Sequence, residues 1–127
     1  MVGLSVGPSL GKFSSYHKNA ASSPKMMNFM FMGARSFNQP LNDWNVSNVR
    51  YITSMFQTAR SFNQPLNNWN VSKVTNMQAM FWGATSFNQP LNNWKVSNVT
   101  GTTEAMFENA TSFNQPLHAP WYVVEQS

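Results

Sequence analysis

The chain lacks cysteine altogether, which excludes disulfide bonds, thiolate zinc sites and a cysteine nucleophile. Charged residues are also scarce, at 9% of the 127 residues, whereas globular proteins usually have about a quarter. No apolar run approaches the roughly 18 residues that a membrane helix needs, so no membrane span is expected. Hydrophobic residues nevertheless make up 42% of the chain, which supports a core and excludes a highly charged disordered chain.

Acidic residues are missing from the first third of the chain, where scattered cations precede Asp43. Their spacing differs from the dense basic cluster of a nucleic-acid-binding arm, so no nucleic-acid partner is expected. The opening "MVGLSVGPSLGKFSSYHK" lacks the continuous apolar centre of a secretory signal. Its basic, Ser-rich character faintly resembles an organelle transit peptide. We expect residues 1–25 to form an irregular basic leader or an N-terminal cap.

An internal repeat dominates the rest of the chain. The motif SFNQP begins in steps of 25, 25 and 26 residues, at Ser36, Ser61, Ser86 and Ser112. A Met-Phe pair recurs with the same steps, at Met30-Phe31, Met55-Phe56, Met80-Phe81 and Met106-Phe107. Two independent markers with one phase indicate a repeat architecture, in which each unit stacks on its neighbours.

Two kinds of apolar spacing occur within one repeat. Trp69 and Val71 share the parity of a half-buried strand, with Leu66 just before them. The apolar residues that follow have the spacing of a short helix, at Val74, Met77, Met80, Phe81 and Ala84. Pro90 then favours an extended turn into the next unit. The pattern predicts strand, short helix and turn in each unit, and a solenoid of about four coils over residues 26–127.

Equivalent residues of stacked coils form columns. Core packing is expected for the tryptophans, Trp44, Trp69, Trp94 and Trp121, and for the methionines, Met27, Met55, Met80 and Met106. Side-chain amides in register are expected to bond along the stack, at Asn38, Asn63, Asn88 and Asn114 and at Gln39, Gln64, Gln89 and Gln115.

The pattern L-x-x-W-x-V-x-x-V, as in Leu41-Trp44-Val46-Val49, resembles the opening of a leucine-rich repeat. The whole unit "MFxGAxSFNQPLNNWNVSNVTNM" resembles the bacterial surface-protein repeat of Mycoplasma and Listeria-type lipoproteins, which is related to BspA-like leucine-rich repeats. The resemblance covers about residues 26–117. It implies an α/β repeat, a short right-handed leucine-rich-repeat-like solenoid with parallel strands on one face and short helices on the other. It also implies surface attachment or protein binding, at the cell surface or outside the cell.

Recognition is expected on the outward face of the predicted strands, which lies on the concave side of such a solenoid. The candidate partner-binding residues there are Asp43, Asn45, Asn68, Asn70, Asn93 and Lys95. Arg35 and Arg60 form a second candidate, a cationic column for a carboxylate or phosphate. Neutral surface variation and a solvated edge are the competing interpretations.

Catalytic chemistry has little support in the sequence. His17 and His118 lie at opposite ends of the chain, and no phosphate loop, metal-ligand cluster or nucleophile motif occurs. We therefore expect no enzyme, no cofactor and no metal. The prediction is a non-catalytic protein-interaction or adhesion module with a protein partner; the alternative is a small structural subunit docked in a larger assembly. An ice-binding solenoid is a third hypothesis, which the absence of a T-x-T column disfavours.

Overall fold

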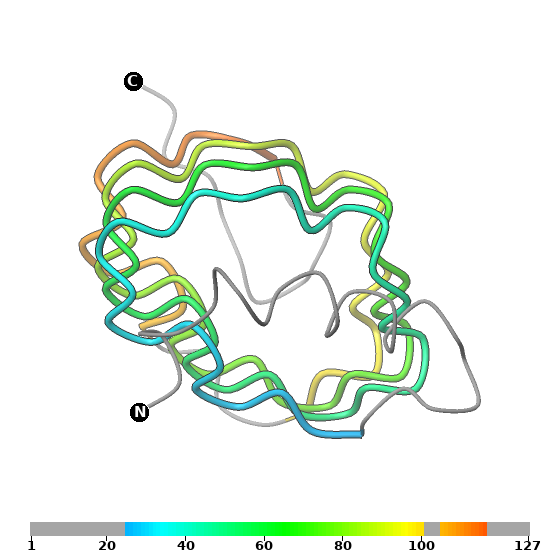
Figure 1. Cartoon of the computed structure of the whole chain (residues 1–127). Helices are drawn as coiled ribbons and strands as arrows, with labels where there is room; N and C mark the ends of the chain where they lie inside the picture. The colour runs from blue at the N-terminus through cyan, green and yellow to red at the C-terminus, as the bar shows by residue number, and fades with distance from the viewer. Residues whose placement is uncertain (1–24, 101–104, 117–127) are drawn as a thin grey trace.

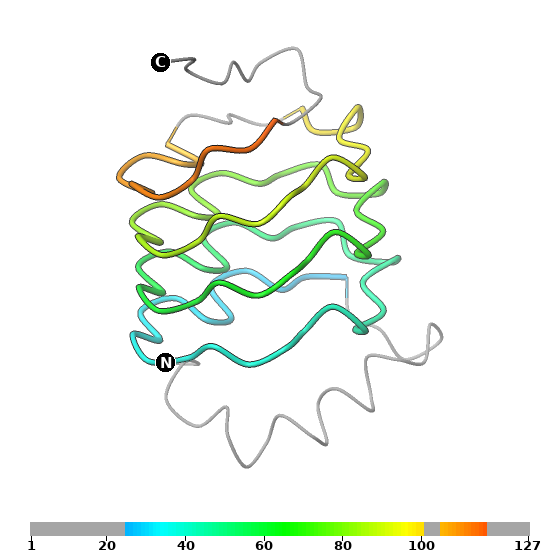
Figure 2. The same cartoon turned by 90° about the horizontal axis from the view of Figure 1, so that it is seen from above.

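The computed structural model describes residues 25–100 and 105–116. Viewed along the stack, the successive repeats superpose on one outline (Figure 1). Viewed from the side, they lie on one another as a stack of coils, with the first described coil at one end and residues 105–116 at the other (Figure 2).

The predicted α/β repeat with strands and helices is wrong. Within residues 25–100 and 105–116 there is neither a helix nor a strand. The ladder-type pairs found there are two isolated parallel bridges, between Met26 and Tyr51 and between Tyr51 and Asn76. The coils consist of turns joined by segments that are neither helix nor strand, so the predicted leucine-rich-repeat-like solenoid of strands and helices is not what the chain forms.

Turns account for the apolar spacing that predicted a helix. Backbone N–H groups donate to the carbonyl three residues back at 3.0 Å in Phe56–Ala59, Leu66–Trp69 and Val71–Val74. Each of these turns begins and ends at a buried apolar residue, while its two middle residues are exposed or half-buried. The middle residues include Asn67, Asn68 and Ser72, types that favour turns over helix interiors.

Backbone groups in the segment predicted to be helical bond to the next coil. Phe81 N–H donates to Met106 O at 2.9 Å, and Gly83 N–H donates to Glu108 O at 2.8 Å. The same pairing joins the earlier coils, from Phe31 N–H to Met55 O and from Phe56 N–H to Met80 O, both at 2.8 Å. These bonds replace the four-residue pattern of an α-helix and set the register between coils.

Two left-handed residues in each coil also exclude a helix, because helical φ angles are negative. The first position has φ between 54° and 64°, at Phe29, Ser54, Ala79 and Ala105. The second lies four residues later and has φ between 55° and 75°, at Gly33, Thr58, Gly83 and Asn109. At position 83 glycine is favoured for two reasons. Its φ of 69° is left-handed, and an added Cβ would lie only 3.1 Å from Thr58 Cγ2.

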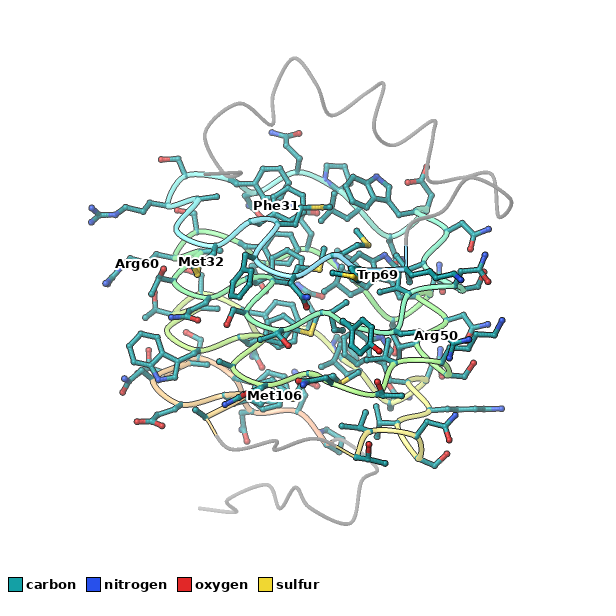
Figure 3. The ribbon with its side chains drawn as sticks, turned by 90° about the horizontal axis from the view of Figure 1, so that it is seen from below. Phe31, Met32, Arg50, Arg60, Trp69 and Met106 are labelled. Atoms are coloured by element: carbon teal, nitrogen blue, oxygen red, sulfur yellow. The ribbon has the colours of Figure 1, made fainter. Side chains whose placement is uncertain are left out.

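Phenylalanine rings form the centre of the core. Neighbouring rings of one column are 5.4–5.6 Å apart between centroids and nearly parallel, in the order Phe31, Phe56, Phe81, Phe107. A second column has centroids 5.9 Å apart, in the order Phe37, Phe62, Phe87, Phe113. The two columns contact each other within every coil at 4.1–4.4 Å. Figure 3 shows Phe31 within this interior.

The predicted core columns are confirmed for the described residues. Trp44, Trp69 and Trp94 are 2–3% exposed, and Met27, Met55, Met80 and Met106 are at most 2% exposed. Trp69 Nε1 donates to Leu41 O at 2.8 Å, and Trp94 Nε1 donates to Leu66 O at 2.8 Å, so these buried indoles bond to the preceding coil. Trp121 lies outside the described residues.

The predicted amide ladder is also confirmed. Asn63 N–H donates to Asn38 Oδ1, Asn88 N–H to Asn63 Oδ1 and Asn114 N–H to Asn88 Oδ1, each at 2.9 Å. The following glutamines, Gln64, Gln89 and Gln115, donate from Nε2 to the same oxygens at 3.1 Å. The asparagines are exposed, so this ladder runs along the surface of the stack.

The Phe81 ring has stacked partners in both adjacent coils, whereas Phe107 is only partly buried. We expect Phe81→Ala to lower the free energy of unfolding by about 3–5 kcal/mol, because it leaves a cavity between two rings. Phe107→Ala should cost clearly less. Urea denaturation of both variants checks this order, and equal losses would contradict the column as a source of stability.

The Asn63 side chain uses its oxygen as the acceptor for Asn88 and Gln89. Asn63→Ala should therefore lower the free energy of unfolding by about 1 kcal/mol through the lost hydrogen bonds. Asn63→Asp keeps an oxygen at this place and should retain most of that stability at neutral pH. Equal destabilisation by the two changes, measured in urea, would argue against the ladder.

Candidate functional site

An open pocket of about 490 Å³ lies where two adjacent coils meet. Most of its lining is polar, and the residues are Asn67, Asn68, Trp69, Asn70, Val71, Ser72, Asn93 and Lys95. Trp69 and Val71 are 2% exposed, so they anchor the lining in the core, whereas Asn68, Asn70, Asn93 and Lys95 are exposed. We call this site the asparagine pocket.

Turn geometry places the polar groups of the asparagine pocket. Asn70 Oδ1 accepts hydrogen bonds from Ser72 N–H at 3.1 Å and from Ser72 Oγ at 2.7 Å, which closes a local turn. Asn93 N–H donates to Asn67 Oδ1 at 2.9 Å across the two coils. These bonds hold the side chains of Asn67 and Asn70 in fixed orientations.

Lys95 is the pocket residue at which the sequence differs from the equivalent positions of the two preceding coils. It occupies the position held by Asn70 one coil earlier and by Asn45 two coils earlier. Asn45 Oδ1 accepts from Ser47 N–H at 3.0 Å and from Ser47 Oγ at 2.6 Å, so the amide at this position normally closes a turn. A lysine cannot accept these bonds, and it supplies the one titratable group of the lining.

Four of the eight residues predicted from the sequence line this pocket: Asn68, Asn70, Asn93 and Lys95. Asp43 and Asn45 occupy the equivalent turns one coil earlier and do not line it; Asp43 is exposed and Asn45 half-buried. The predicted concave strand face is not formed, because none of the segments that carry these residues is a strand. Their role in binding a partner stays a prediction.

The predicted cationic column lies elsewhere on the molecule. Arg35 and Arg60 are both exposed and occupy equivalent positions, and Thr85 Oγ1 continues the column by donating to Arg60 O at 3.4 Å. Figure 3 shows Arg60 on the opposite side of the stack from Trp69 and Arg50. The two predicted candidate sites are therefore separate surfaces.

Asn67, Trp69, Val71 and Ser72 line the pocket but were not among the predicted site residues. Alternation along a strand assigned Trp69 and Val71 to the core, which is correct, and gave no reason to expect a hollow above them. The one indication in the sequence that these four residues line the same site was their position next to Asn68 and Asn70 along the chain. Hollows between coils depend on which side chains are shorter than their neighbours, and repeat spacing does not contain that information.

Residues 25–100 and 105–116 contain neither a metal-binding cluster nor a membrane-spanning helix. No group of three His, Cys, Asp or Glu side chains in these ranges is placed to hold a metal ion. No helix of the described part is long and apolar enough to span a bilayer.

A family described as "Mycoplasma protein of unknown function, DUF285" matches residues 12–121 of the chain. The match agrees with the Mycoplasma-type surface repeat that the sequence resembles, while a relation to BspA-like leucine-rich repeats is not shown. No curated protein matches the chain. No solved structure matches it either.

Replacing Lys95 by Asn restores the residue of the preceding coil. The new amide should accept hydrogen bonds from the Ser97 backbone and hydroxyl, as Asn70 does from Ser72. We expect Lys95→Asn to raise the free energy of unfolding by about 0.5–1.5 kcal/mol, whereas Lys95→Ala should give no such gain. Urea denaturation measures both, and the same value for the two variants would show that the turn needs no amide.

Proposed function

The chain belongs to the DUF285 family of Mycoplasma-type proteins of unknown function, and from that premise we propose that it is a non-catalytic module that binds a protein partner through the asparagine pocket. The observation that carries the proposal is the lining itself. Amide, hydroxyl and ammonium groups from two coils converge on one open pocket of about 490 Å³. Adhesion is the form that this binding would take if the partner lies on another cell.

Preorganised hydrogen-bonding groups support recognition of a polypeptide. Asn amides offer a donor and an acceptor each, which matches the alternating groups of a peptide backbone. The turn bonds within Asn70-Val71-Ser72 and the bond from Asn93 to Asn67 hold the lining in one arrangement.

The lining offers little for catalysis. Acid–base chemistry at neutral pH needs titratable groups near one another, and nucleophilic catalysis needs an activating base. Lys95 is the titratable residue of this pocket, and the remaining polar groups are amides and one hydroxyl. This composition favours binding over turnover as the function of the site.

Photo-crosslinking tests the proposal. A benzophenone amino acid is placed at Asn68 in the pocket, or at Arg60 on the opposite side as the matched control. In extract of the source organism, the probe at Asn68 should give a discrete adduct, which the additional change Lys95→Ala weakens. The probe at Arg60 should give none. The same adducts from both positions, or adducts indifferent to Lys95→Ala, would reject the pocket as the binding site.

A further inference from the structure

A second surface of the first two coils combines positive charge with exposed apolar side chains. It consists of Lys25, Met26, Phe29, Arg50 and Tyr51, which we call the basic–aromatic patch. Met26 is 59% exposed, Phe29 48% and Tyr51 41%, and within the described ranges these are the large hydrophobic side chains that are exposed. Because exposed apolar side chains that lie together often mark interaction sites, their position beside two exposed cations suggests a binding surface.

Backbone pairing brings the members of the basic–aromatic patch together. Arg50 N–H donates to Lys25 O at 2.8 Å, so the two cations are stacked in adjacent coils. Met26 forms a parallel bridge with Tyr51, one residue further along each coil. Phe29 N–H donates to Thr53 O at 2.9 Å, which places Phe29 beside the same coil as Tyr51.

The repeat itself shows that the fold does not require these side chains. The next coil has Thr75 and Asn76 in place of Arg50 and Tyr51, and the backbone contacts continue unchanged. Thr75 N–H donates to Arg50 O at 2.8 Å, and Asn76 forms the parallel bridge with Tyr51. Small polar residues thus fulfil the stacking role at these positions.

The backbone conformation of Phe29 is a second, independent indication that this patch has a function. Its φ of 63° lies in the left-handed region, and the equivalent positions are occupied by the small residues Ser54, Ala79 and Ala105. A bulky side chain in this region is an outlier that costs free energy. Strain of this kind concentrates at functional sites, where the side chain is kept for another purpose. Here the strained residue also exposes its ring.

We propose that the basic–aromatic patch is a second docking surface, which binds an acidic polypeptide segment that carries aromatic or aliphatic side chains. Lys25 and Arg50 supply the charge complement, and Met26, Phe29 and Tyr51 supply apolar contact area. Aromatic residues, Met and Arg are enriched at the centres of protein interfaces. This inference does not depend on the asparagine pocket, because the two surfaces share no residue.

Charge favours an acidic partner for the basic–aromatic patch, which contains Lys25 and Arg50 and no acid. The described residues include six lysines and arginines and two acids, Asp43 and Glu108, and neither acid belongs to the patch. A polypeptide accounts for the patch better than a nucleic acid. Two cations are few for nucleic acid, since its binding depends on Lys and Arg side chains that neutralise many backbone phosphates.

The repeat supplies its own test variants. Arg50→Thr with Tyr51→Asn copies Thr75-Asn76, and Phe29→Ser copies Ser54, so both variants use residues that the same backbone already accommodates. The probe is a labelled Glu-rich peptide that contains Phe residues, with a Glu-rich peptide without Phe as its control. Fluorescence anisotropy with the full chain measures binding, and urea denaturation measures stability.

We expect the Phe-containing peptide to bind more tightly than its control, and each variant to weaken that binding by roughly ten-fold or more. The urea midpoint should not fall in either variant, because the repeat already holds the new residues at equivalent positions. The pocket variant Asn68→Ala with Lys95→Ala should bind the peptide as the unaltered chain does, which separates this proposal from the preceding one.

Three results would overturn the inference. The first is equal binding of the two peptides, and the second is full peptide binding by both patch variants. The third is a labelled single-stranded oligonucleotide that binds more tightly than the peptide and is released by the same variants, which would assign the patch to nucleic acid.

Discussion

The register of the hydrogen bonds between coils is the constraint on which the rest of the molecule depends. Backbone N–H groups of one coil reach carbonyls of the next with an offset of 24 or 25 residues, as from Phe31 to Met55 and from Phe81 to Met106. Each offset is one residue less than the local repeat step of 25 or 26 residues, as when an N–H bonds to the carbonyl of the residue that precedes its equivalent, so equivalent residues lie above one another. The phenylalanine columns, the indole bonds and the amide ladder all follow from that alignment.

Register also divides the positions of the repeat into two kinds. A residue inside a column, such as Phe56 or Asn63, has a like residue in the neighbouring coils and is restrained by both. A residue outside the columns can differ between coils without altering the backbone. Lys95 stands where the preceding coil has Asn70, and Arg50 stands where the next coil has Thr75. The basic–aromatic patch lies where the repeat departs from itself, and so does Lys95 in the otherwise repetitive lining of the asparagine pocket.

The period, the buried columns and the amide ladder could be predicted from the sequence, because each depends only on which residues recur and how polar they are. Secondary structure could not. A turn that begins and ends at buried residues, such as Val71–Val74, produces the same three-residue apolar spacing as a helix. The left-handed residues could not be predicted either, since Phe29, Ser54 and Ala79 are not residue types that favour this conformation. For the candidate sites, the difference between Lys95 and Asn70 was visible in the repeat. Arg50 and Tyr51 were not predicted, because only the outward positions of the predicted strands and the Arg35–Arg60 column were considered as binding sites.

The ladder has a consequence for how such a chain can change over generations. Each described contact between coils, from the 2.9 Å bond of Asn88 to Asn63 to the stacked rings of Phe56 and Phe81, joins immediate neighbours. Insertion or deletion of one whole unit in the gene therefore leaves every remaining type of contact intact. A shift by part of a unit would bring unlike residues together, except where the extra residue falls between the columns, as in the 26-residue step between Phe81 and Phe107. Unequal recombination between near-identical units would lengthen or shorten the protein in steps of one coil, and each step would add or remove surface without requiring a new core.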